Sequence, residues 1–241
     1  MKISYRPDID ALRGIAVLSV LFYHAKFTYL GVRLFSGGFL GVDIFFVLTG
    51  FLITTLLFKE YKENNNINIL NFYLRRVRRL VPALLVVVVI ATFFSFFYLD
   101  PVKLKEFSAS VLFSLTFLAN LYFHYFGDHY GAQSNLSKPL LHLWSLGIEE
   151  QFYIFYPLVL TIIFKYAKKY FLFFLCLGFF LSLLMAEYVS TYHKQFSFYM
   201  LPSRAWEIII GSVLTVILLN KKKDFGLSKN IENFIYLFCI V

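Results

Sequence analysis

Residues 80–99 read LVPALLVVVVIATFFSFFYL, and no charged side chain occurs between Arg79 and Asp100. A helix needs about 20 consecutive apolar residues to cross the hydrocarbon core of a bilayer. Similar apolar runs flank this one, at residues 11–30, 39–58, 143–164, 170–190, 205–220 and 231–241. Together with one shorter, more polar segment, they predict an all-α, polytopic transmembrane bundle of about 7–8 apolar segments.

The composition also indicates a chain that is solvated by lipid. Of the 241 residues, 59% are hydrophobic and 15% are charged, whereas soluble domains are about 45–50% apolar and about 25% charged. The net charge of +9 is assigned to membrane topology and anionic lipid, and we expect no nucleic-acid partner. Cys176 and Cys239 lie in apolar runs and predict neither a disulfide nor a metal site.

The two ends of the chain carry different signals. The polar residues 1–10 precede no signal-peptide cleavage pattern, so the first apolar run is predicted to stay as a membrane anchor. The last run, 231–241, is still apolar at Val241. We therefore expect residues 1–241 to form a single membrane domain that is incomplete at its C-terminal end.

The segment 108–124 has two possible topologies. It is short and rich in serine, and it either crosses the membrane or enters and returns. Basic residues in the loop 59–79 place that loop in the cytoplasm, and the N-terminus with it. A segment that does not cross also puts the later lysine clusters, at 165–169 and 221–223, on the cytoplasmic side. We therefore predict that residues 100–140 form an extracytoplasmic, partly re-entrant region that lines a cavity.

Arg13 and His24 are ionisable residues inside the first apolar run, where charge is costly and often functional. Eleven helical steps rotate the chain by about 1100°, so both side chains share one face, about 16 Å apart along the axis. Taken singly, Arg13 could reach the headgroups and His24 could sit at the interface. The aligned pair favours a functional site.

Two further groups have both a functional and a structural interpretation. Asp43 follows Gly41 at the outer end of the second run, where glycines can also serve helix packing. The cluster Arg75, Arg76, Arg78 and Arg79 suits phosphate groups, because guanidinium binds them in a bidentate manner. The same cluster also suits a topology anchor against anionic lipid.

A histidine and two glutamates enter the apolar run that begins near residue 143. His142 and Glu149 are seven residues apart and can share a helix face, with Ser145 between them. Buried carboxylates can act as acid or base. The alternative is a structural polar network. Glu149 and Glu150 are adjacent, so we expect them to face different ways.

Five stretches, in order, resemble the motifs of the acyltransferase-3 family of bacterial membrane O-acyltransferases. These are residues 5–17, 41–46, 75–82, 144–153 and 202–207. The resemblance covers essentially the whole chain. It implies transfer of an acyl group, usually acetyl, from cytoplasmic acyl-CoA to a hydroxyl of a cell-surface glycan such as lipopolysaccharide O-antigen, capsule or peptidoglycan. It also implies a multi-pass protein of the bacterial inner membrane with no resident cofactor or metal.

The resemblance assigns roles to individual residues. His24 is expected to act as general base on the acceptor hydroxyl or as a transient acyl carrier, with Glu149 to orient or charge-balance it. Asp43 is grouped with these catalytic positions. The phosphates of acyl-CoA are expected to bind Arg13, Arg75 and Arg78.

Two alternative functions stay open at this point. The same polar residues would suit a transporter or flippase of lipid-linked sugars, although such proteins often carry internal repeats or paired broken helices, and the sequence shows no repeat. A chain shortened at its end could also be an inactive remnant of the enzyme.

Overall fold

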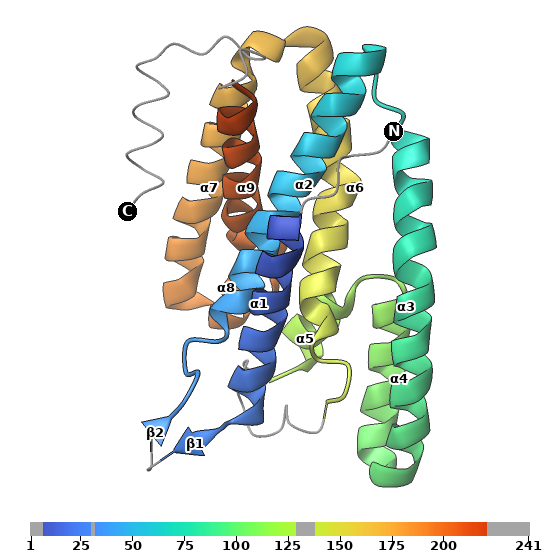
Figure 1. Ribbon diagram of the computed structural model, residues 1–241. Coiled ribbons are helices and arrows are strands. Elements are labelled where there is room, and N and C mark those ends of the chain that lie inside the picture. The colour runs from blue at the N-terminus through green and yellow to red at the C-terminus, as the bar shows by residue number, and fades with distance from the viewer. Residues whose placement is uncertain (1–6, 30–31, 129–137, 221–241) are drawn as a thin grey trace. The chain divides into compact units, whose positions relative to one another are not determined.

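The computed structural model describes residues 7–29, 32–128 and 138–220, which are helical nearly throughout (Figure 1). The helices are α1 (Pro7–Ala25), α2 (Leu40–Asn64), α3 (Ile69–Tyr98), α4 (Pro101–Leu115), α5 (Ala119–Phe126), α6 (Leu143–Tyr166), α7 (Phe171–Tyr192), α8 (Lys194–Tyr199) and α9 (Leu201–Asn220). Strands β1 (Thr28–Tyr29) and β2 (Val32–Arg33) form a short antiparallel pair, and a single 3-10 turn, η2 (Lys168–Tyr170), precedes α7. The predicted all-α fold is confirmed. The predicted segment 231–241, the lysines at 221–223 and Cys239 lie outside the described residues.

Among the described residues, five helical segments are long and apolar enough to cross a membrane. They are α2, α3, α6, α7 with the turn before it, and α8 together with α9. The chain is therefore a multi-pass membrane protein. Helix α1 is not one of the five, because its 19 residues include Asp8, Asp10 and Arg13. The first predicted span thus forms a helix, but one that ends at Ala25 and is more polar than an ordinary span.

Helix α3 begins eleven residues before the apolar run that predicted it, so the arginine cluster lies within the helix. The side chain of Asn68 caps the helix by accepting a hydrogen bond from the Asn71 N–H, at 3.0 Å. At the other end, Asp100 accepts from the Lys103 N–H at 3.0 Å, and Pro101 occupies the first turn of α4. An acidic cap followed by proline is a strong helix start. It reverses the chain so that α4 packs back along α3 (Figure 1).

The ambiguous segment 108–124 is broken into two short helices. Helix α4 ends at Leu115 and α5 begins at Ala119, and between them Phe117 has a φ of 57°. That left-handed conformation is unfavourable for residues other than glycine, and it marks the break between α4 and α5. With 15 residues in α4 and 8 in α5, neither reaches the length of about 20 residues that a span needs. The segment therefore does not form a single transmembrane helix.

The chain divides into two compact units. The first contains residues 1–63, 168–179 and 206–241, and the second contains residues 64–167 and 180–205. Two of the boundaries fall inside α7 and α9, and each unit is built from segments that are distant in the sequence.

In the first unit, α2 and α9 approach closely through small residues. A Cβ atom at Gly50 would collide with the carbonyl oxygen of Ile208, and one at Gly211 with that of Val47. The hydroxyl of Thr54 donates to that of Ser212 at 2.8 Å. Small residues and hydroxyl hydrogen bonds are the usual means by which membrane helices associate.

In the second unit, one buried asparagine ties three helices together. The Asn120 amide of α5 accepts a hydrogen bond from Gln151 Nε2 of α6 at 2.8 Å and donates to the Tyr199 carbonyl of α8 at 3.0 Å. Gly147 leaves the room for it, because a Cβ there would lie 2.7 Å from Asn120 Oδ1. A satisfied polar network of this kind fixes the register of the helices that it joins.

Candidate active site

The structure places the sequence-predicted site residues in two groups. Arg13, His24 and Asp43 belong to α1 and α2 of the first unit, and Arg75, Arg78 and Glu149 to α3 and α6 of the second.

His24 lies in the last turn of α1 and is exposed. Its Nδ1 atom lies 2.8 Å from the carbonyl oxygen of Val20. A carbonyl oxygen can only accept, so Nδ1 must carry the hydrogen, and in the neutral ring the lone pair is then on Nε2. A neutral imidazole with a fixed tautomer is the form that a general base requires.

The other two residues of this group, Arg13 and Asp43, lie on helices α1 and α2, which are in close contact near the start of α2. A Cβ at Gly38 would lie 2.8 Å from that of Tyr23, and one at Gly41 would lie 2.8 Å from Val20 Cγ2. Asp43 is two residues further into α2, so it lies nearer the middle of α1 than His24 does. Arg13 pairs with Asp10 through Nη1 and Oδ1 at 3.7 Å, one helical turn away.

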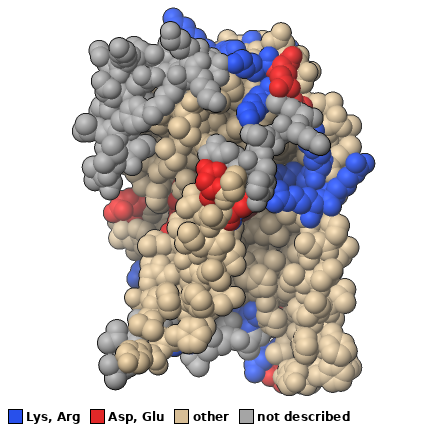
Figure 2. Space-filling view, in the orientation of Figure 1, with Lys and Arg blue, Asp and Glu red and all other residues tan. Residues whose placement is uncertain are grey.

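The arginine cluster of α3 separates into exposed and inward-facing members. Arg75, Arg78 and Arg79 are exposed, whereas Arg76 is half-buried and its guanidinium carbon lies 3.5 Å from the centroid of the Tyr153 ring of α6. Figure 2 shows basic side chains gathered towards one end of α3, and the rest of that helix is uncharged on this face. The exposed arginines can bind an anion, and Arg76 joins α3 to α6.

The two adjacent glutamates of α6 differ in burial. Glu149 is half-buried and Glu150 is buried. Oε1 of Glu150 has no hydrogen-bond partner in the part of the chain that the structure describes, and the nearby positive charge of Arg76 acts on this carboxyl group. The two adjacent carboxyl groups thus differ in burial, as expected for neighbouring residues of one helix.

Several polar contacts of the second unit were not predicted from the sequence. The Asn120–Gln151 pair and the stacking of Arg76 on Tyr153 join residues that are 31 and 77 positions apart. Asn120 inside an apolar run was the one available signal, because a buried amide requires a partner. Nothing in the spacing of the residues identifies that partner as Gln151.

The fold and the polar residues define a class of protein. It is a multi-pass membrane protein with an exposed histidine near the end of one helix and an exposed arginine cluster on another. Residues 6–231 match the acyltransferase 3 family, which is described as an acyltransferase domain. The chain belongs to this family.

Curated relatives of the chain are O-acetyltransferases. The peptidoglycan O-acetyltransferase OatA of Listeria monocytogenes is 39% identical over 165 residues, which are 68% of this chain and 26% of the relative. The O-acetyltransferase OatA of Staphylococcus aureus (strain NCTC 8325) is 39% identical over 157 residues, 65% of this chain and 25% of the relative. The chain thus spans about a quarter of the length of these relatives. No solved structure matches it.

Proposed function

We propose that this protein is a membrane-bound O-acetyltransferase that moves an acetyl group from cytoplasmic acetyl-CoA to a hydroxyl of a cell-wall glycan, with peptidoglycan as the favoured acceptor. The observation that carries the proposal is the 39% identity to a peptidoglycan O-acetyltransferase within a family match that covers nearly the whole chain. Peptidoglycan is one of the three surface glycans that the sequence alone allows as acceptor.

The proposed chemistry is acyl transfer with general-base assistance. The acceptor oxygen attacks the thioester carbonyl carbon, a C–O bond forms and the C–S bond breaks. His24 takes the hydroxyl proton on Nε2 and returns it to the CoA thiolate, so that free CoA leaves as the thiol. The contact between Nδ1 and the Val20 carbonyl supports this role, because it puts the basic lone pair on Nε2.

The donor is proposed to bind at the arginine cluster. Arg75 and Arg78 are exposed and three residues apart on α3, so their guanidinium groups can engage neighbouring phosphates of CoA. Arg13 is proposed to contribute to phosphate binding, and Asp43 and Glu149 to act as acidic groups in the transfer step.

The distribution of basic residues supports a proposed orientation in the membrane. Helix α6 runs opposite to α3 (Figure 1) and ends with Lys165 in its last turn, on the side where α3 begins. By the positive-inside rule, that side, with Arg75 and Arg78, is proposed to be the cytoplasmic one, where acetyl-CoA is found. The N-terminus is proposed to lie on the same side.

Acetyl transfer is tested with membranes that contain this chain, acetyl-CoA labelled in its acetyl group, and de-O-acetylated peptidoglycan. The proposal predicts base-labile label in the glycan, because an ester is hydrolysed by mild base. Membranes without the chain are the control. Label absent from the glycan, with lipid-linked sugar crossing the membrane instead, would favour the transporter alternative.

A further inference from the structure

Glu150 is a buried carboxyl group to which the proposed chemistry gives no role. It lies in α6, one of the helices that are long and apolar enough to cross a membrane, and it is only 9% exposed. Its Oε1 atom has no hydrogen-bond partner among the described residues. An ionisable side chain at membrane depth is costly, and such side chains almost always pair with an opposite charge. Glu150 therefore requires a positive group nearby.

Helix geometry places Arg76 beside this carboxyl group. Glu150 and Tyr153 are three residues apart on α6, so their side chains lie on the same face of the helix. Side chains of a helix lean toward its N-terminus, which brings the Tyr153 ring toward the turn that carries Glu150. The Arg76 guanidinium carbon lies 3.5 Å from the centroid of that ring. The positive charge of Arg76 accordingly acts on the Glu150 carboxyl group.

The two charged groups attract each other without forming a close ion pair. No salt bridge joins Glu150 to Arg76 within the part of the chain that the structure describes. Attraction between opposite charges is screened less away from water, so it acts beyond hydrogen-bond distance. The guanidinium carbon also lies 5.8 Å from the ring centroid of Phe72, which is buried. Arg76 is thus held by two aromatic rings and one buried negative charge.

The direction of Arg76 fixes the directions of its neighbours in α3. Successive residues of a helix are about 100° apart around its axis. Arg75 therefore points about 100° away from Arg76, and Arg78 points about 160° away from it. The two differ from each other by only about 60°, and both are exposed. When Arg76 packs against α6, Arg75 and Arg78 together face away from that helix.

We propose that Glu150 is a positioning residue for donor binding. Its buried carboxylate attracts Arg76 and keeps the guanidinium group on the Tyr153 ring. This contact holds the start of α3 in the rotation that presents Arg75 and Arg78 to the phosphates of acetyl-CoA. The link to the donor rests on the proposed function, whereas the coupling between Glu150 and Arg76 does not.

A double-mutant cycle measures this coupling by thermal unfolding in one detergent. Arg76→Ala should lower Tm and leave the Glu150 carboxylate buried without its positive partner. Removing one member of a buried charge pair is more costly than replacing both. Glu150→Gln should therefore lower Tm in the wild-type background and recover part of the lost Tm in the Arg76→Ala background. The same shift of Tm in both backgrounds would overturn the proposal.

Equilibrium binding of acetyl-CoA to the detergent-solubilised full chain tests the positioning role. Glu150→Gln keeps the shape of the side chain and removes its charge, and it should raise the Kd about fivefold, in the usual range for coupled residues. Glu150→Asp restores the charge and should bring the Kd back toward that of wild type. Glu187→Gln is the matched control, because Glu187 is exposed on α7, and it should bind as wild type does. In acetyl transfer, Glu150→Gln should raise KM for acetyl-CoA and leave kcat near that of wild type.

The outcomes separate this proposal from the proposed function. An unchanged Kd in Glu150→Gln, or a raised Kd that Glu150→Asp does not lower, would overturn the positioning role. So would a wild-type chain that binds no acetyl-CoA. A wild-type chain that binds acetyl-CoA but transfers no acetyl group would instead count against the proposed function, and it would leave the results on Glu150 unchanged.

Discussion

The guanidinium carbon of Arg76 lies 3.5 Å from the centroid of the Tyr153 ring and so joins the basic start of α3 to the middle of α6. The contact lies within the second unit and is reinforced by the Tyr73 hydroxyl, which donates to the Ile154 carbonyl at 2.7 Å. Arg76 is thereby withdrawn from the exposed face that its neighbours occupy. The arginine cluster has a structural member and exposed members, and these should respond differently to substitution.

Arg76→Ala should destabilise the protein more than Arg79→Ala does. A cation–π contact is worth about 0.5–2 kcal/mol, whereas substitution of an exposed residue usually changes stability by less than about 0.5 kcal/mol. Thermal unfolding of the two variants in the same detergent measures the difference. Equal shifts in Tm would show that the Arg76–Tyr153 contact does not contribute.

Arg75→Ala and Arg78→Ala should weaken binding of acetyl-CoA while leaving the fold intact. Loss of a hydrogen bond to a charged phosphate costs about 1.5–3 kcal/mol, so the KM for acetyl-CoA should rise at least about tenfold. Lys169→Ala removes an exposed positive charge outside the cluster and is the control. If the control raises KM as much, the effect is one of general charge and not of phosphate binding.

Gly211→Val should strongly reduce the amount of folded protein, and Gly50→Ala should do the same. Both glycines of the first unit touch the backbone of the facing helix, so an added side chain must push α2 and α9 apart. Overpacking costs about 1–3 kcal/mol and more where backbone must move. Gly14→Ala is the contrasting variant, because a Cβ there meets nothing within 4 Å. It should stabilise α1 by up to about 1 kcal/mol, as thermal unfolding would show.

The stability of the protein should fall as the pH is lowered through about 6.5, in part because of His124. Burial lowers the pKa of His124 from 6.5, and the nearby charge of His193 lowers it further. The unfolded chain therefore takes up its proton at a higher pH than the folded chain, and protonation favours unfolding. The decline should end once the pH is below the folded pKa. His124→Gln should reduce this pH dependence of Tm, and a variant with the same pH profile as wild type would contradict the assignment to His124.

The sequence predicted the helices well because each membrane span is a run of about 20 apolar residues, which can be recognised without the tertiary structure. The runs at 39–58, 143–164 and 170–190 correspond closely to α2, α6 and α7. The start of α3 was missed, since Arg75 to Arg79 interrupt the apolar pattern without interrupting the helix. The break at Phe117 was not located either, because a phenylalanine in a left-handed conformation is a result of tertiary packing and has no local signature.

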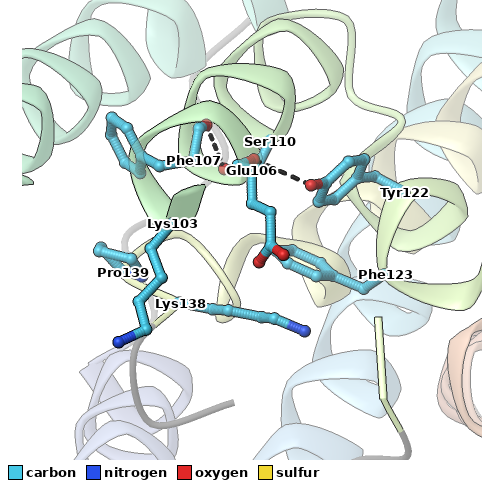
Figure 3. A pocket seen from close by; sticks show the side chains of 8 residues that line it. All are labelled: Lys103, Glu106, Phe107, Ser110, Tyr122, Phe123, Lys138 and Pro139. Carbon is cyan, nitrogen blue, oxygen red and sulfur yellow. Dashed lines mark hydrogen bonds between the residues drawn. The ribbon is translucent and has the colours of Figure 1, made fainter. Parts of the chain in front are cut away.

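The candidate site was predicted only as a set of residues. A family resemblance can single out His24 or Arg75, but contacts between helices depend on how the helices pack. Arg76 and Arg75 are equivalent in the sequence, and only the position of Tyr153 makes one half-buried and the other exposed. The small cavity lined by Glu106, Tyr122 and Lys138 (Figure 3) is likewise formed by residues from three segments, and no motif joins them.

The most direct test of the account is the rate of acetyl transfer from labelled acetyl-CoA to peptidoglycan by His24→Ala, measured beside wild type in membranes with equal amounts of protein. If His24 is the general base, the variant should lose at least about 10²-fold in rate while its KM for acetyl-CoA stays near that of wild type. A His24→Ala protein that transfers acetyl at the normal rate would contradict the central claim.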